Sequence, residues 1–454
     1  MATMLLDSLA KPGWLDDRTQ SLMDQAIARE KALSAALMTY IVSGLVFMLL
    51  PGTFLGVWNL ISISRLQAAE KISPGWIQAH GHAQIFGWVA TFVLGIGFYS
   101  IPKLRKMKPF PLWRAWVCWC VWTGGVLLRW AMTIWPWHWR GGLPLSAAME
   151  LGAFLLFFLT IGPAHSSADG AARKPWEPWI YAVLLGTSGL LLALVLQVVE
   201  SLRLSLHARS PSFPVAFDQR YLAVLAWGFL VPFVWGFSAR WLPVFAGLRP
   251  TRSALFLAGV ALDLSGVGAA LGGAFRAATL FFAAGALSAT LALRFLEPSR
   301  SKPKVAGIHP SFAVFLRLAY VWLLIAAALG VWAAFHRQDS SGIWGASRHA
   351  LTVGFVAAMV FSVGQRVLPS FCGMRILASR ALMFAGLLLL MMGCTLRVTS
   401  EVLAYQAYAN WAWQILPVSA VVEMTAVTLF AVNLVWTFLR PPVVAPSPLQ
   451  MYVE

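Results

Sequence analysis

The sequence predicts an all-α membrane protein with twelve transmembrane helices in three four-helix units. Of its 454 residues, 59% are hydrophobic and only 11% are charged, so a soluble fold would expose a very large apolar surface. Runs of about 20 apolar residues, enough to cross a hydrocarbon core of about 30 Å, recur along the whole chain. One residue frame repeats in the second, sixth and tenth runs, which indicates the division into units.

Twelve apolar runs of this length can be assigned to spans. They cover residues 37–60, 79–101, 113–135, 143–163, 177–199, 220–245, 253–273, 277–296, 312–335, 348–369, 380–398 and 415–439. We expect one membrane domain at 33–440, after a polar segment at 1–32 and before a tail at 441–454. The leading segment lacks the pattern of a cleaved signal peptide. Within it, SLMDQAIAREKALSAALM at 21–38 is compatible with an amphipathic helix on the membrane surface.

The net charge of +17 is interpreted as a signal of membrane orientation, not of a nucleic-acid partner. With a cytoplasmic amino terminus, the cytoplasmic side holds the dense clusters KLRKMK at 103–108 and RFLEPSRSKPK at 294–304. The opposite loops hold scattered cations such as Arg65 and Arg140. We therefore expect both termini in the cytoplasm, with membrane lipid as the surrounding partner.

Spans two and ten share a frame of histidine, then glycine after five residues, an aromatic after six, glycine after fifteen and proline after twenty. The residues are His82, Gly87, Trp88, Gly97 and Pro102, and His349, Gly354, Phe355, Gly364 and Pro369. Span six joins this frame through Trp227 and Gly236 behind Tyr221, with its proline two residues late. Because the three spans run in the same direction, their leading residues should lie at similar depth near the outer face.

An imidazole inside a bilayer needs a hydrogen-bond partner, a proton path or a metal. A lone histidine is as readily a satisfied packing residue as a ligand, but two in one frame favour a shared ligand. A haem bound axially by His82 and His349 would satisfy both. Gly87 and Gly354 would let a ring or a helix approach closely, whereas ordinary helix packing better explains the glycines at position fifteen.

His80 cannot share the face of His82, because two residues turn a helix by about 200°. In the expected topology six of the eight histidines lie on the outer side, and copper is a plausible user of such imidazoles. His80, His82 and His349 are therefore the candidate metal ligands. Interfacial or loop positions explain the other outer histidines better; these are His138, His207 and His336.

Charged residues within the spans are further candidates. Arg129 in span three and Arg348 beside His349 are placed to pair with haem propionates. Asp263 lies near the middle of span seven, and Glu150 and Glu423 are also intramembrane candidates. Such carboxylates either pair between helices or mark a proton route, and both interpretations stay open.

The motifs AHGHAQIFGW at 79–88 and RHALTVGF at 348–355 resemble the NnrS family of twelve-span bacterial proteins linked to the nitric oxide response. The matching residues are His80, His82, Phe86 and Gly87, and His349, Ala350, Leu351, Thr352 and Gly354. The sequence departs from the family at Ala83 and Gln84, where Glu or Met is common, and in its extra leading segment. The resemblance implies a b-type haem, with copper as a further cofactor. It also implies a bacterial inner-membrane location and a role in nitrosative stress with a gas such as nitric oxide as ligand.

The sequence is also similar to subunit I, the catalytic subunit of haem–copper oxidases and nitric oxide reductases. That subunit has twelve spans in three arcs of four, and histidines of spans two and ten hold its low-spin haem. Here spans six and seven lack the histidines of the binuclear metal centre, and Ser347 and Leu351 flank His349. The resemblance therefore implies the scaffold and one haem, without a centre that reduces oxygen.

Three functions stay open at this point. The first is a haem protein that senses, binds or detoxifies nitric oxide. The second is an oxidase or nitric oxide reductase subunit, which needs metal ligands that the sequence lacks. The third is a proton-coupled transporter, which the parallel repeats and Asp263 would suit. Nothing in the sequence resembles a phosphate-binding loop or a nucleophile elbow, so the sequence gives no support to hydrolase or nucleotide-driven chemistry.

Overall fold

The computed structural model describes residues 17–105, 107–162, 176–336, 341–373 and 375–441. Within these ranges it has no β-strand and contains twelve helical stretches long and apolar enough to cross a membrane. They are Thr19–Leu66, Pro74–Leu104, Trp113–Ile134, Trp139–Ile161, Pro178–His207, Val215–Phe245, Ser253–Leu271, Phe275–Ala292, Phe312–Phe335, Ser341–Phe371, Arg380–Tyr405 and Ala412–Leu439. Each coincides with a predicted run, so the all-α, twelve-span fold is confirmed.

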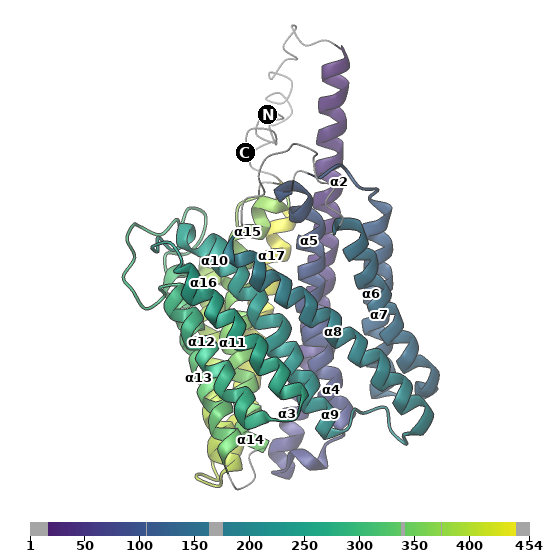
Figure 1. Cartoon of the computed structure of the whole chain (residues 1–454), viewed down its shortest axis with the longest axis vertical. Helices are drawn as coiled ribbons and strands as arrows, with labels where there is room; N and C mark the ends of the chain where they lie inside the picture. The colour runs from purple at the N-terminus through teal and green to yellow at the C-terminus, as the bar shows by residue number, and fades with distance from the viewer. Residues whose placement is uncertain (1–16, 106, 163–175, 337–340, 374, 442–454) are drawn as a thin grey trace.

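Eight spans are single α-helices and four are interrupted (Figure 1). The single helices are α6 (Trp113–Ile134), α7 (Trp139–Ile161), α8 (Pro178–His207), α11 (Ser253–Leu271), α12 (Phe275–Ala292), α13 (Phe312–Phe335), α16 (Arg380–Tyr405) and α17 (Ala412–Leu439). The interrupted spans are α2 (Asp17–Phe47), η1 (Met48–Phe54) and α3 (Leu55–Leu66); α4 (Pro74–His82), η3 (Ala83–Ala90) and α5 (Thr91–Leu104); α9 (Val215–Ala223), η4 (Val224–Leu230) and α10 (Val231–Phe245); and α14 (Ser341–His349), η5 (Ala350–Ala357) and α15 (Ala358–Phe371). The short 3₁₀ helix η2 (Ala69–Lys71) follows span one.

The interruptions η1, η3, η4 and η5 are π-helical segments. The segment begins directly after His82 in span two and directly after His349 in span ten, and it begins three residues after Tyr221 in span six. Spans two and ten therefore share an interruption at the same place in the residue frame, and that of span six begins two residues later in the frame. π-Helical turns are rare in proteins and are frequent at functional sites.

A π-helical segment frees carbonyl oxygens from the regular helical pattern, and neighbouring side chains bond to them. The Phe86 carbonyl accepts from Thr91 Oγ1 at 3.0 Å and from Trp122 Nε1 at 3.2 Å. In span one, the Met48 carbonyl accepts from Thr53 Oγ1 at 2.8 Å. These bonds compensate the interruptions inside the apolar bundle, where no water could do so.

Helix α2 runs without a break from the leading polar segment into the first span. Its first turns stand out beyond the ends of the other helices in Figure 1. Tyr99 and Lys103 both donate to Glu30 Oε1 at 2.7 Å, and Arg29 donates to the Phe110 carbonyl at 2.8 Å. The helix expected to lie flat on the membrane at 21–38 is therefore an upright extension of span one, while residues 1–16 lie outside the described residues.

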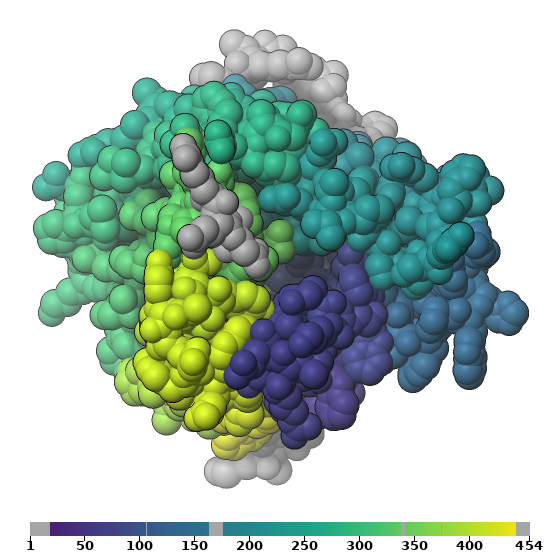
Figure 2. All heavy atoms as spheres, turned by 90° about the horizontal axis from the view of Figure 1, so that it is seen from below, coloured from purple at the N-terminus to yellow at the C-terminus, as the bar shows by residue number. Residues whose placement is uncertain are grey.

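The first and last spans pack together and close the bundle. Helix α17 contacts α2, η1 and α3, and the purple amino-terminal and yellow carboxy-terminal helices lie side by side in Figure 2. Helices α4 and α14, which carry the histidines, lie toward the lower end of the bundle in Figure 1. The first turns of α2 lie at the opposite end, so the histidines of spans two and ten are at the same end, as predicted.

Three glycines of the repeated frame make room for aromatic side chains: Gly87, Gly97 and Gly354. A Cβ atom on Gly87 would lie 2.7 Å from Phe47 Cβ, and one on Gly354 would lie 2.5 Å from Trp322 Cγ. Protein side chains therefore lie directly against these glycines, which allow close helix packing. A Cβ atom on Gly364 would meet only ordinary contacts.

Spans five and six provide a test of this close packing. A Cβ atom on Gly189 would collide with the backbone oxygen of Gly228, whereas one on Gly268 would meet nothing within 4 Å. We expect Gly189→Ala to lower the free energy of unfolding by about 1–3 kcal/mol, as overpacking does, and Gly268→Ala to leave it unchanged. Thermal unfolding of the two variants in one detergent measures the difference, and equal midpoints would contradict the packing.

Candidate functional site

The two histidines of the His-Gly-His motif point to different helices. His80 lies against span one, where its Nδ1 is 2.8 Å from the Gly52 carbonyl oxygen of η1. A Cβ atom on Gly56 would be 2.6 Å from His80 Cε1, so this glycine makes room for the ring. Because a carbonyl oxygen can only accept, Nδ1 carries the proton and Nε2 keeps its lone pair.

His349 has the same tautomer. Its Nδ1 donates to the Gly345 carbonyl oxygen at 3.1 Å and lies 3.5 Å from Glu401 Oε2. Its side chain is 28% exposed. His80 lies within electrostatic range of His349, and Arg397 lies near both.

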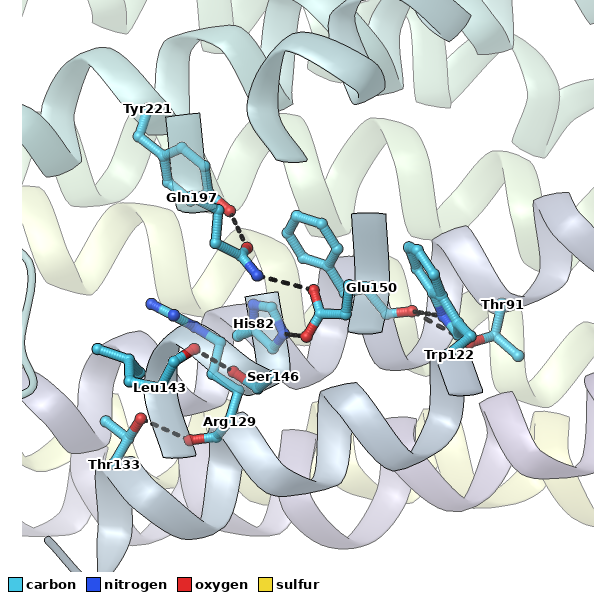
Figure 3. A network of polar contacts seen from close by, with 11 residues as sticks. His82, Thr91, Trp122, Arg129, Thr133, Leu143, Ser146, Glu150, Gln197 and Tyr221 are labelled. Atoms are coloured by element: carbon cyan, nitrogen blue, oxygen red, sulfur yellow. Dashed lines mark hydrogen bonds and ion pairs between the residues drawn. The ribbon is translucent and has the colours of Figure 1, made fainter. Parts of the chain in front are cut away.

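His82 belongs to a buried polar network that joins four spans (Figure 3). Its Nε2 is hydrogen-bonded to Glu150 Oε1 at 3.0 Å, and its ring stacks on Phe86 with centroids 4.4 Å apart. The other Glu150 oxygen accepts from Gln197 Nε2 at 2.9 Å, and Gln197 Oε1 accepts from Tyr221 at 2.6 Å. The leading residues of spans two and six are thus linked, and the Nε2 atom of His82 is occupied.

Two arginines predicted for the site are near the same carboxylate. Asp218 is within electrostatic range of both Arg129 and Arg348. Arg129 is 4% exposed and packs its guanidinium 4.4 Å from the ring centroid of Phe213, while its Nη1 is buried without a hydrogen-bond partner. Arg348 is exposed and is also near Glu401. One unpaired donor and one accessible cation are therefore available for an anionic group.

The intramembrane carboxylates behave differently from one another. Glu150 pairs between helices, through His82 and Gln197. Asp263 is fully buried on α11, and neither of its oxygens has a hydrogen-bond partner. Within the described residues Asp263 makes no hydrogen bond or ion pair with the histidines, so it stands apart from this site.

Possible metal-ligating side chains lie apart from one another, in pairs at most, in the described part of the chain. Among the described residues there is no group of three or more His, Cys, Asp or Glu side chains close enough to hold an ion. The outer histidines expected in loops are dispersed: His138 caps α7, His207 ends α8 and His336 follows α13.

A shallow pocket lies beside His349 on span ten, with about 560 Å³ of empty space that includes its open mouth. Ser347, Arg348 and Leu351 line one wall, and Trp227 lines another, where it stacks on Phe282 with centroids 4.6 Å apart. Its lining includes no histidine.

Several contributors to the site were not predicted from the sequence. Gly52 supplies the carbonyl that orients His80, and Glu401 and Arg397 lie beside His349. A Pro-Gly pair in the middle of span one signals a break that frees carbonyl oxygens. An Arg and a Glu four residues apart in span eleven are equally readable as an intramembrane pair.

Comparisons with known proteins agree with the motifs. The family model described as NnrS protein matches residues 33–441. Among solved structures, the chain is similar to a heme-copper terminal oxidase, solved as a dimer, with a TM-score of 0.68 and 14% sequence identity. The similarity covers 92% of this chain and 86% of that chain, and at this identity it concerns the fold alone. No protein in the curated comparison matches the chain.

The buried network of Glu150 can be tested by its effect on stability. We expect Glu150→Ala to destabilise the protein, because His82 and Gln197 would each lose a partner at about 1–3 kcal/mol per unpaired group. The matched control is Glu177→Ala, since Glu177 is 60% exposed and surface ion pairs contribute little. Thermal unfolding in detergent measures both, and equal effects would show that the network is not stabilising.

Proposed function

This chain belongs to the NnrS family and has a haem–copper-oxidase-like fold, and from that premise we propose that it binds one haem and acts in the response to nitric oxide or nitrosative stress. The proposed axial ligands are His80 and His349. The proposed haem is b-type, held by coordination and non-covalent contacts.

One observation carries the proposal. His80 and His349 come from distant parts of the sequence and lie within electrostatic range of each other. In each ring the Nδ1–H group donates a hydrogen bond to a backbone carbonyl oxygen. Metal-bound histidines almost always donate their other ring nitrogen in this way, which fixes the tautomer and the ring orientation. Among the hydrogen bonds of the described residues, neither Nε2 atom has a partner.

The choice of His80 replaces the expectation that His82 is the second axial ligand. The Nε2 atom of His82 is bonded to Glu150, and releasing it would leave a buried carboxylate without that partner. His80 and His82 stand two positions apart on α4, so only one of them can face the space in front of His349. We therefore propose a structural role for His82.

The remaining residues of the site suit an anionic macrocycle. Arg129, with its unpaired Nη1, and the accessible Arg348 would hold the two propionates by charge-assisted hydrogen bonds. Gly56 leaves room for the His80 ring. A bound haem would supply redox chemistry and a binding position for a small gas such as nitric oxide. Copper fits the described residues less well, because no third donor joins His80 and His349.

We also propose a bacterial inner-membrane location with both termini in the cytoplasm. An even number of spans brings both ends of the bundle to one side. Lys103 donates to Glu30 at the beginning of span one, and Arg105 donates to the Gly162 carbonyl at the end of span four. Arg440, after span twelve, donates to the Ala378 carbonyl. These cations lie at the end expected to be cytoplasmic, which agrees with the positive-inside rule.

The absorption spectrum of the protein purified in detergent tests the haem site. We expect a Soret band with bis-imidazole character that is lost in His80→Ala and in His349→Ala, because each removes one axial nitrogen. His82→Ala should retain haem with reduced stability, and His207→Ala should match the unaltered protein. If haem is lost in His82→Ala and retained in His80→Ala, His82 and not His80 is the ligand. Absence of haem from the unaltered protein after iron-replete expression would refute the site.

The physiological role can be tested in cells that lack the gene. We expect the unaltered protein to shorten the growth delay after addition of a nitric oxide donor and His349→Ala to fail at equal abundance. Asp263→Asn should protect fully, because Asp263 lies apart from the histidines. Protection lost in Asp263→Asn but kept in His349→Ala would favour the transporter alternative.

A further inference from the structure

Glu401 of α16 places a carboxylate oxygen beside a proposed axial histidine. Its Oε2 atom is buried and has no hydrogen-bond partner. The closest cationic or imidazole nitrogens are Arg397 Nη2 at 3.4 Å and His349 Nδ1 at 3.5 Å. A buried acceptor without a bond is costly, so this oxygen is available for a donor that moves a few tenths of an ångström.

The packing of α14 against α16 holds the carboxylate in this place. Gly345 lies one turn before His349, and a Cβ atom on it would collide with Glu401 Oε1. A glycine is therefore required for Glu401 to lie over α14. The same residue supplies the carbonyl that now accepts from His349, so two acceptors compete for one Nδ1 proton.

We propose that Glu401 is a positioning residue that accepts a hydrogen bond from His349 and lowers the reduction potential of the bound haem. This inference rests on the proposed haem site. When the Nε2 lone pair of His349 binds iron, the ring proton must be on Nδ1. A carboxylate that accepts this proton makes the imidazole a more basic ligand, and a more basic axial ligand stabilises the oxidised iron.

The two axial histidines would then be unequal. His80 donates to the neutral Gly52 carbonyl, whereas His349 would donate to a charged group. Arg397 forms an ion pair with Glu401 and partly neutralises its charge. Arg348 and Glu423 are the other charged side chains within electrostatic range of Glu401. The Glu401 carboxylate thus lies near His349 with part of its charge neutralised, which suits a small change in the reduction potential of the bound haem.

A redox titration of the purified haem protein, followed by its absorption spectrum, tests the proposal. We expect E401Q to retain bis-imidazole haem and to have a higher midpoint potential. At a fixed potential its ratio of reduced to oxidised haem should rise about tenfold, the scale of an altered ligand partner, which is about 59 mV for one electron. E401D should lie between E401Q and the unaltered protein.

The matched control is E423Q, which removes a half-buried carboxylate near Glu401 that has no hydrogen bond or ion pair with His349. It should shift the potential much less than E401Q. Equal shifts would overturn the proposal, because they would show only the effect of nearby charge, and no shift in E401Q would overturn it as well. If E401Q does not assemble, G345A displaces the carboxylate without removing it and should raise the potential; an unchanged potential in G345A overturns the proposal.

The same preparation separates this inference from the proposed function. Absence of haem from the unaltered protein overturns both. Bis-imidazole haem lost in His349→Ala, together with an E401Q potential equal to that of the unaltered protein, keeps the haem site and overturns only the role of Glu401.

Discussion

Inside a bilayer every polar group must find its partner within the protein, and this constraint organises the site. The π-helical segments would be costly if their carbonyl oxygens stayed unpaired. Thr91 and Trp122 satisfy the Phe86 carbonyl, and the interruption in span one presents the Gly52 carbonyl to His80. The backbone irregularity is therefore part of the site, because it provides an acceptor that a regular helix would keep for itself.

The same constraint distinguishes the two neighbouring histidines by their hydrogen-bond partners. His82 is satisfied by Glu150, and that pair continues through Gln197 to Tyr221 across spans two, four, five and six. His80, on the opposite face of the same helix turn, has only one nitrogen satisfied by protein. His80 is half-buried, and its Nε2 lone pair stays available to a ligand.

The sequence predicts the fold well because hydropathy and span length depend on local composition. The twelve runs follow from that information, and the repeated residue frame marks spans two, six and ten. The partners of His82 and His80 do not follow from the sequence, because two residues on one helix face opposite sides and only the packing of α4 decides which side is which. Gly87 and Gly354 were likewise ambiguous, since a missing side chain serves a ring and an aromatic neighbour equally well.

The departures from the oxidases bear on what such a haem could do. Beside His349 the pocket wall carries Ser347, and Trp227 stacks on Phe282 across from it, so aromatic packing stands where a second metal centre would need imidazoles. The described residues would therefore hold one haem, through His80 and His349, and its chemistry would be that of a single redox group that can also bind a gas. The two histidines differ in their acceptors, because Glu401 Oε2 lies 3.5 Å from His349 Nδ1, whereas His80 Nδ1 has the neutral Gly52 carbonyl at 2.8 Å. The hydrogen bond that each histidine donates would tune the electronic properties of that one group.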